Sequence, residues 1–121
     1  MYNHMVVSSP LPDAQVDRLF RALADTTRRD IVARVLAGEA ASVSALAARY
    51  TMSFAAVQKH VAVLEQAGLV SKHQRGRERI VRGNPEQLAH ARELLLQLER
   101  LWVERFSQLD AVLADPRHNK E

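Results

Sequence analysis

The sequence predicts a mainly α-helical chain with about five helices and one small β-hairpin. Three observations indicate this fold class. Apolar residues recur at helical spacing in four segments up to residue 67, short apolar pairs then flank a polar centre between residues 69 and 82, and helical spacing resumes from residue 85. Of the 121 residues, 47% are hydrophobic and 26% are charged, which is typical of an ordinary globular protein.

We expect one domain, from residue 13 to residue 114. Residues 1–12 carry two prolines and no sustained periodicity, so they are interpreted as a flexible arm. Residues 115–121 are interpreted as a flexible tail. No internal repeat or low-complexity tract divides the chain further.

The first two helices are predicted at residues 13–24 and 26–37. A cap is expected near Asp13 for the first, and Asp25 is a good N-cap for the second, because its carboxylate can accept hydrogen bonds from the free amides of the first turn. Gly38 can adopt the left-handed conformation that ends a helix. The two apolar stripes comprise Val16, Leu19, Phe20 and Leu23, followed by Ile31, Val32, Val35 and Leu36.

Two closely spaced helices are predicted next. Ser42 or Ser44 can cap a short helix that reaches Tyr50, and Ser53 can cap another that ends at Gly68. Two helices joined by a short turn, with small and polar residues on the outer face of the second, describe a helix-turn-helix unit, whose second helix fits the major groove of DNA. On that second helix the spacing places Phe54, Val57, Val61 and Leu64 on one side and turns Ala55, Gln58, Lys59 and Ala62 outward.

Residues 69–82 predict a β-hairpin with its turn around residues 75–77. Five basic side chains lie in this segment against one acidic side chain, Glu78, although the net charge of the whole chain is only +3. A basic hairpin directly after a helix-turn-helix can lie along DNA phosphates, where it supplies affinity more than sequence choice. The fold class is therefore a winged helix-turn-helix. The basic residues of the predicted wing are Lys72, Arg75, Arg77, Arg79 and Arg82.

The last helix is predicted from Pro85 to Leu113, with Asn84 as its cap and proline at the first helical position. Its apolar stripe is wider than one small core can cover, and exposed apolar patches of that size usually mark an interface. We therefore expect a homodimer held by the first and last helices. The expected interface residues are Leu19, Phe20, Leu23, Leu94, Leu95, Leu98, Leu101, Trp102, Phe106 and Leu109.

Several function classes have no support in the sequence. The chain has no cysteine, which excludes disulfides, thiolate metal sites and cysteine nucleophiles. It has no Gly-rich phosphate loop, nucleophile elbow or HExxH motif, so we predict no enzyme activity and no cofactor. Because His90 is a lone histidine on its helix, we predict no metal site. The absence of a long apolar run predicts a cytoplasmic protein without a membrane partner.

Three segments together resemble the ArsR family of transcriptional repressors. They are ALADTTRRDIV at residues 22–32, MSFAAVQKHVAVLEQAGLV at residues 52–70 and GRERIVRGNPEQL at residues 76–88, in the order that the family has them. The likeness covers residues 14–113. The combination is specific, whereas either helical motif alone would indicate only a helix-turn-helix.

The resemblance implies a homodimer whose two recognition helices read a two-fold DNA site near a promoter and repress transcription by occluding the polymerase. Lys72 is included as a further basic residue of the DNA-binding wing. His60 matches a common family position, although packing is its expected role. The resemblance places Ser53, Phe54, Ala55, Gln58 and Lys59 at positions that face the major groove, and Arg75, Arg77 and Arg79 on the wing.

The sequence departs from the family pattern in two places. Metal-sensing members carry a cysteine pair in the third helix, where this chain reads SVSALAA at residues 42–48, so the resemblance is to the branch without that sensor. Many members have an aromatic and an aliphatic residue where this chain has Val81 and Gly83, which leaves the packing of the wing open.

One alternative function is a winged helix that binds another protein instead of DNA. Such modules usually lose the basic wing, and this chain keeps it, so DNA binding is the favoured interpretation. Nothing in the sequence identifies a small-molecule effector.

Overall fold

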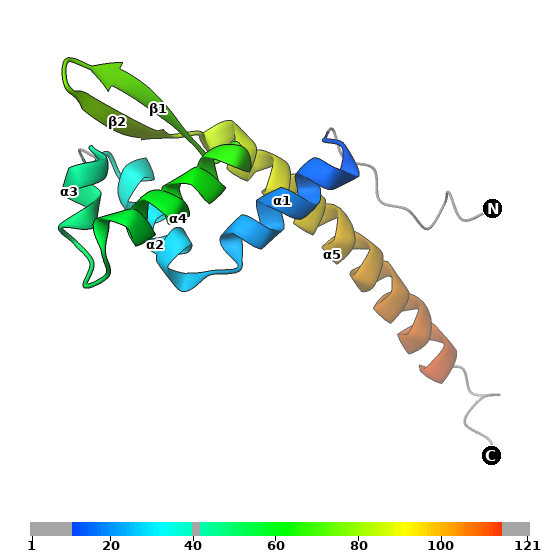
Figure 1. Ribbon diagram of the computed structural model, residues 1–121. Coiled ribbons are helices and arrows are strands. Elements are labelled where there is room, and N and C mark those ends of the chain that lie inside the picture. The colour runs from blue at the N-terminus through cyan, green and yellow to red at the C-terminus, as the bar shows by residue number, and fades with distance from the viewer. Residues whose placement is uncertain (1–10, 40–41, 115–121) are drawn as a thin grey trace. The chain divides into compact units, whose positions relative to one another are not determined.

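The computed structural model describes residues 11–39 and 42–114, which form five helices and one two-stranded antiparallel sheet (Figure 1). This architecture confirms the predicted fold class. The expected tail, and all but the last two residues of the expected arm, lie outside the described residues. The elements are α1 (Asp13–Leu23), α2 (Thr26–Leu36), α3 (Val43–Ala47), α4 (Phe54–Gln66), β1 (Val70–Arg75), β2 (Glu78–Gly83) and α5 (Pro85–Ala114).

Short polar side chains start the helices largely where the sequence predicts. The Asp25 carboxylate accepts from the Arg28 amide at 3.0 Å and begins α2. Ser42, and not Ser44, caps α3 by accepting from the Ala45 amide. The prediction for α1 was wrong in one detail: Asp13 is the first helical residue, and Pro12 precedes it without a side-chain cap.

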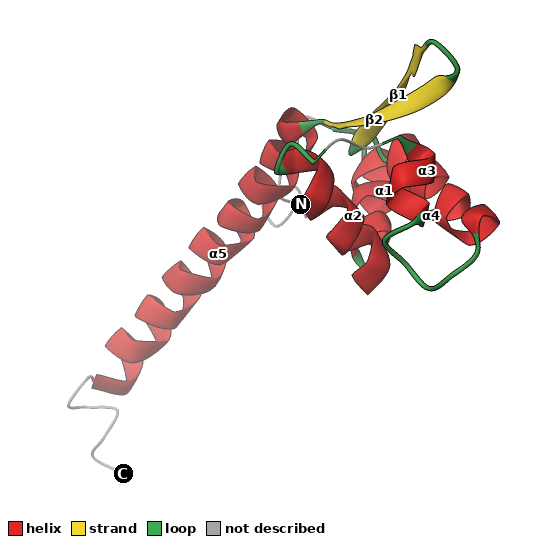
Figure 2. Cartoon of the chain, turned by 90° about the vertical axis from the view of Figure 1, so that its left-hand side faces the viewer, coloured by secondary structure: helices red, strands yellow, loops and turns green. Residues whose placement is uncertain are grey.

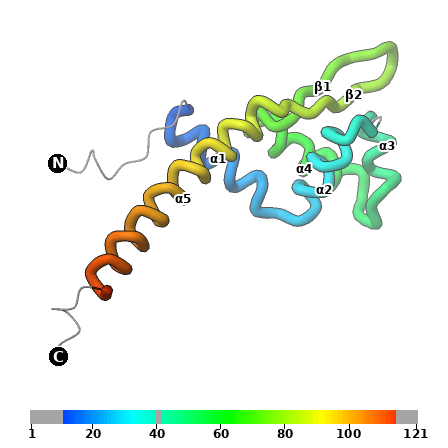
Figure 3. Tube along the Cα trace, turned by 180° about the vertical axis from the view of Figure 1, so that it is seen from behind, coloured from blue at the N-terminus to red at the C-terminus, as the bar shows by residue number. Residues whose placement is uncertain are grey.

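The core lies among α1, α2, α4 and the base of the hairpin. Ile31, Val57, Val61 and Leu64 are fully buried, because the apolar stripes of α2 and α4 face one another across the centre. Figure 3 shows α2, α3 and α4 grouped on one side of the hairpin. This packing fixes the position of α4, whose opposite face is left open to solvent.

Leu19 requires a correction, since it was predicted to lie in a dimer interface. Its side chain is 1% exposed and belongs to the core, so it has no surface to offer a second chain. Phe20 and Leu23, from the same predicted set, are half-buried and pack against that core. The α1 stripe therefore points mainly inward.

The base of the hairpin packs against the helical body. Val81 is buried, and a Cβ placed on Gly83 would lie 2.6 Å from Leu36 Cδ2, so the Leu36 side chain fills the space that a larger residue would need. Ser42 also forms an isolated antiparallel bridge with Ile80. These contacts supply the packing of the wing that the sequence left open.

The described residues fall into two compact units, which divide between Ala91 and Arg92 inside α5. The first unit contains α1 to α4, the hairpin and the first turns of α5. The second contains the remainder of α5, a regular helix with most of its apolar side chains exposed. In the described part of the chain, no helix combines the length and hydropathy of a membrane span.

Candidate nucleic-acid interface

The start of α4 presents the predicted outer face to solvent. Ala55, Gln58 and Lys59 are exposed, while Val57 and Val61 on the opposite side are buried. The Ser53 hydroxyl accepts from the Ala56 amide at 3.1 Å and thereby begins the helix. Figure 2 shows α3 and α4 joined by a loop, with the hairpin above them. This is the geometry of a helix-turn-helix with a wing.

Phe54 is not buried, although the spacing places it on the same side of its helix as Val57 and Val61. Its side chain is 46% exposed, because the first residue of the helix lies beyond the edge of the core that covers Val57 and Val61. Phe54 instead lines a groove together with Gln58. It therefore presents an aromatic surface to whatever molecule binds there.

A groove of about 190 Å³ lies between the start of α3, the start of α4 and the tip of the hairpin. It brings together four of the predicted site residues, although they come from two separate segments of the sequence. It also adds α3 residues that the prediction missed. The lining residues are Ser42, Val43, Ser44, Phe54, Gln58, Arg77, Glu78 and Arg79.

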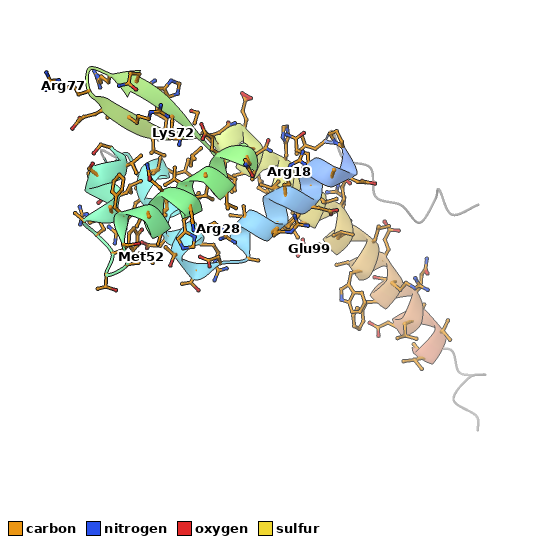
Figure 4. The ribbon with its side chains drawn as sticks, viewed as in Figure 1. Arg18, Arg28, Met52, Lys72, Arg77 and Glu99 are labelled. Carbon is orange, nitrogen blue, oxygen red and sulfur yellow. The ribbon has the colours of Figure 1, made fainter. Side chains whose placement is uncertain are left out.

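The wing arginines carry uncompensated charge. Arg75, Arg77 and Arg79 are exposed, and none of them forms an ion pair within residues 11–39 and 42–114. Side chains alternate along a strand, so Arg79 lies on the same face of β2 as the buried Val81. Arg75 pairs in register with Glu78 on the other face. Arg77 lies at the tip of the hairpin (Figure 4).

Lys72 has a different setting from the other wing cations. Its ammonium lies 3.4 Å from the Glu65 carboxylate near the end of α4, and its side chain is half-buried. Figure 4 shows it at the base of the hairpin, where β1 approaches α4. Lys72 therefore links the hairpin to α4, and less of its charge is available to a ligand.

His60 takes part in a junction of α1, α2 and α4. Its Nδ1 lies 3.3 Å from the Arg28 guanidinium, which also donates to the carbonyls of Ala22 at 2.8 Å and Arg21 at 3.1 Å. The pKa of Asp25 lies below its ordinary value, mainly because its carboxylate accepts a hydrogen bond from the Arg28 backbone amide. His60 is half-buried in this junction, and its role in packing or DNA binding stays a prediction.

A second polar network, which no sequence pattern indicated, holds the turn between α3 and α4 against α2. The Tyr50 hydroxyl donates to the Asp30 carboxylate at 2.6 Å, and Arg34 Nε donates to the same oxygen at 2.8 Å. Arg34 and Arg49 both pair with Glu39. Burial and then the hydrogen bond to Asp30 raise the pKa of Tyr50 to about 12. The Tyr50 and Arg34 hydrogen bonds hold the pKa of Asp30 below its ordinary value.

We expect an Asp30→Asn protein to lose about 1 kcal/mol of unfolding free energy at neutral pH, a modest amount because the carboxylate is partly exposed. The pKa of Asp30 is lower in the folded protein than in the unfolded chain, where it is about 3.9. Its carboxylate therefore stabilises the fold fully above pH of about 3.9, and this stabilisation is lost as the pH falls through the pKa of the folded state. Urea unfolding of both proteins from pH 7 to pH 3 measures the gap. A gap that stayed constant throughout this range would contradict the assignment.

Within the part of the chain that the structure describes, no three His, Asp or Glu side chains gather where they could hold a metal ion. His90 lies 3.2 Å from the Gln87 side chain, and Gln87 donates to the Ala67 carbonyl at the end of α4. His90 therefore belongs to a structural contact.

Known proteins resemble this chain in both sequence and fold. A family model described as a helix-turn-helix domain matches residues 23–73. The HTH-type transcriptional regulator Rv2034 of Mycobacterium tuberculosis is 41% identical over 87 residues, which cover 72% of this chain and 78% of that protein. An ArsR-like transcriptional regulator from Rhodococcus sp. RHA1 has a TM-score of 0.76 and 29% identity, over 83% of this chain and 91% of its own. The crystal structure of an ArsR family transcriptional regulator has a TM-score of 0.70 and 33% identity, over 76% and 94% of the two chains.

Proposed function

Because the chain belongs to the ArsR family of helix-turn-helix transcriptional regulators, in the branch without metal-sensing cysteines, we propose that it is a repressor that binds an inverted-repeat operator as a homodimer. A repressor of this kind acts on cytoplasmic DNA and blocks access of the polymerase. The observation that carries the proposal is the groove, bordered by the exposed face of α4 and by Arg77 and Arg79, which have no ion-pair partner among the described residues.

The charge of this face favours DNA binding over the alternative of a protein-interaction module. Gln58, Lys59, Arg77 and Arg79 present donors and positive charge suited to base edges and phosphates, and they outnumber the one exposed aromatic side chain there, Phe54. Fluorescence anisotropy with the upstream region of the protein's own gene, repeated at rising salt, tests the proposal. Binding that is saturable, specific and weakened by salt supports it, and no binding to DNA at low salt would refute it.

Gln58 is assigned to base recognition. Its amide can form a bidentate pair with adenine, and the exposed Phe54 ring beside it can contact a thymine methyl group. We expect Gln58→Ala to cost about 1–3 kcal/mol on the operator and little on unrelated DNA. Anisotropy with both DNAs measures the two costs. Equal weakening would assign Gln58 to positioning and not to specificity.

Arg77 and Arg79 are assigned to DNA phosphates. We expect Arg77→Ala to weaken binding to all sequences alike and to flatten the slope of log affinity against log salt by about one unit, because one fewer counterion is released. Arg82→Ala is the matched control: Arg82 also belongs to the basic hairpin, but it lies at the base, paired with Ser71, and does not line the groove. The measurement is a salt titration of the three proteins. Equal slopes for the Arg77 and Arg82 variants would contradict the assignment of Arg77 to a DNA phosphate.

The homodimer is assigned to the exposed apolar side chains of α5. Trp102 and Phe106 contact each other edge to face at 5.0 Å, and both remain about half exposed in the single chain. A two-fold pairing of such stripes would bury this surface, and dimeric helix-turn-helix proteins place their recognition helices about 34–36 Å apart, or a multiple of that. The proposed interface comprises Phe20, Leu23, Leu94, Leu95, Leu98, Leu101, Trp102, Phe106 and Leu109.

A further inference from the structure

The groove between α3, α4 and the hairpin has the chemistry of a small-molecule site as well as that of a DNA-facing surface. Arg77 and Arg79 supply guanidinium groups without an ion-pair partner among the described residues. The Gln58 amide and the Ser44 hydroxyl supply neutral hydrogen-bonding groups, and the Phe54 ring supplies an exposed aromatic wall. Aromatic, amide and guanidinium groups that converge on one hollow are typical of sites for small organic anions.

The size of the groove limits what it can hold. Its volume of about 190 Å³ is smaller than the about 300–1,000 Å³ typical of sites for drug-sized molecules. A single ring with one charged substituent fits this scale. A ring can stack on Phe54 while a carboxylate reaches a guanidinium, which binds carboxylates in a planar, bidentate geometry.

We propose that this groove binds a small aromatic carboxylate, one ring with one anionic group, and that the bound ligand releases DNA. A ligand in the groove prevents Gln58, Arg77 and Arg79 from contacting the operator, so ligand and DNA compete for the same side chains. The ligand is then an inducer that acts by direct displacement. Ligand binding is independent of the proposed function, and only the release of DNA rests on it.

Glu78 modifies the expected affinity because it also lines the groove. One carboxylate against two guanidinium groups leaves the groove positive, yet it opposes an incoming anion. Removing that charge with Glu78→Gln should therefore tighten the binding of the ligand. This change tests the sign of the interaction without deleting a group that the ligand contacts.

The first experiment uses benzoate and the full chain without DNA. Benzoate is titrated into the ¹⁵N-labelled protein, and amide chemical shifts are followed at millimolar concentrations. We expect saturable shifts at residues of the groove. Benzoate should bind about tenfold more weakly to Arg79→Gln than to the parent protein. Arg82→Gln is the control, because Arg82 lies on the opposite face of β2 from Arg79, and it should bind benzoate within about twofold of the parent protein. Benzamide tests the need for the charge and cyclohexanecarboxylate the need for the aromatic ring, and both should bind more weakly than benzoate.

Several outcomes would overturn the proposal: no saturable shift in the groove, equal losses in the Arg79 and Arg82 variants, or benzamide binding as tightly as benzoate. The second experiment measures the affinity for operator DNA in the presence of benzoate. Over a series of benzoate concentrations, we expect the apparent dissociation constant for DNA to rise linearly with free benzoate once the groove is mostly occupied, because ligand and DNA compete for one site. An unchanged constant would overturn displacement. A protein that bound no DNA would instead refute the proposed function, while the titration of the free chain would still report on the site.

Discussion

A Leu98→Asp protein is expected to be monomeric at micromolar concentration and to bind its operator about 100-fold or more weakly than the parent protein. Leu98 is 46% exposed in the single chain and lies near the middle of the apolar stripe of α5. A carboxylate placed there would have to be buried without a partner if two stripes met. A monomer binds each half-site of the operator separately. It therefore loses the affinity gained by linking two binding events, a factor of about 10²–10⁴.

Val103→Asp provides the matched control. Val103 is also an exposed apolar residue on α5, at 55%, but it lies five residues on, about 140° around the helix axis from Leu98. The same change of side chain there should leave both assembly and operator binding intact. Sedimentation velocity and anisotropy on the two variants measure these quantities. A Leu98→Asp protein that remained a dimer and bound normally would show that another surface forms the interface.

Arg28→Ala is expected to lower the unfolding free energy by about 2–4 kcal/mol, a large share of the about 5–15 kcal/mol available to a small domain. The Arg28 guanidinium closes the end of α1 by donating to the Ala22 and Arg21 carbonyls, and it reaches His60 on α4 as well. Its side chain is only 16% exposed, so water cannot readily replace these hydrogen bonds. Losing it removes the guanidinium donor of the Ala22 carbonyl, whereas the Arg21 carbonyl still accepts from the Ala24 amide.

The neighbouring Arg29 offers a control with the same chemistry and less burial. Its guanidinium donates to one carbonyl, that of Leu23 at 2.7 Å, and the residue is exposed. Arg29→Ala should therefore cost less than about 1 kcal/mol. Urea unfolding at a fixed protein concentration compares the two variants, because the stability of a dimer depends on that concentration. Similar losses in both would contradict the special role of Arg28.

The boundaries of the elements could be predicted because the signals for them are local. Asp25, Ser53 and the glycines at positions 38 and 68 mark helix ends through their own backbone and side-chain chemistry, and both glycines have positive φ, 85° and 77°. The burial of Leu19 and the exposure of Phe54 were not predicted, because burial is not a local property. Whether an apolar residue at the edge of a stripe is covered depends on the elements packed around it, which spacing alone does not specify.

The candidate site was predictable in its composition but not in its geometry. The sequence identified Gln58 and the wing arginines, yet it treated Arg75, Arg77 and Arg79 as equivalent. The strand register separates them, since Arg79 shares a face with the buried Val81 and Arg75 does not. Ser44 and Tyr50 were missed as contributors, because their roles arise from contacts between segments that are distant in the sequence.

The attachment of the hairpin also bears on how fast the proposed operator would be bound. The base of the hairpin is held by the buried Val81, by the Lys72–Glu65 ion pair and by the bridge between Ser42 and Ile80. A hairpin held in this way is already ordered before it contacts DNA, so little conformational entropy is lost on binding. Association is then governed by diffusion and by the attraction between exposed guanidinium groups and phosphates, with no folding step to wait for. Loosening the base, as in Lys72→Ala, would slow the capture of DNA even though the tip of the wing kept all its charges.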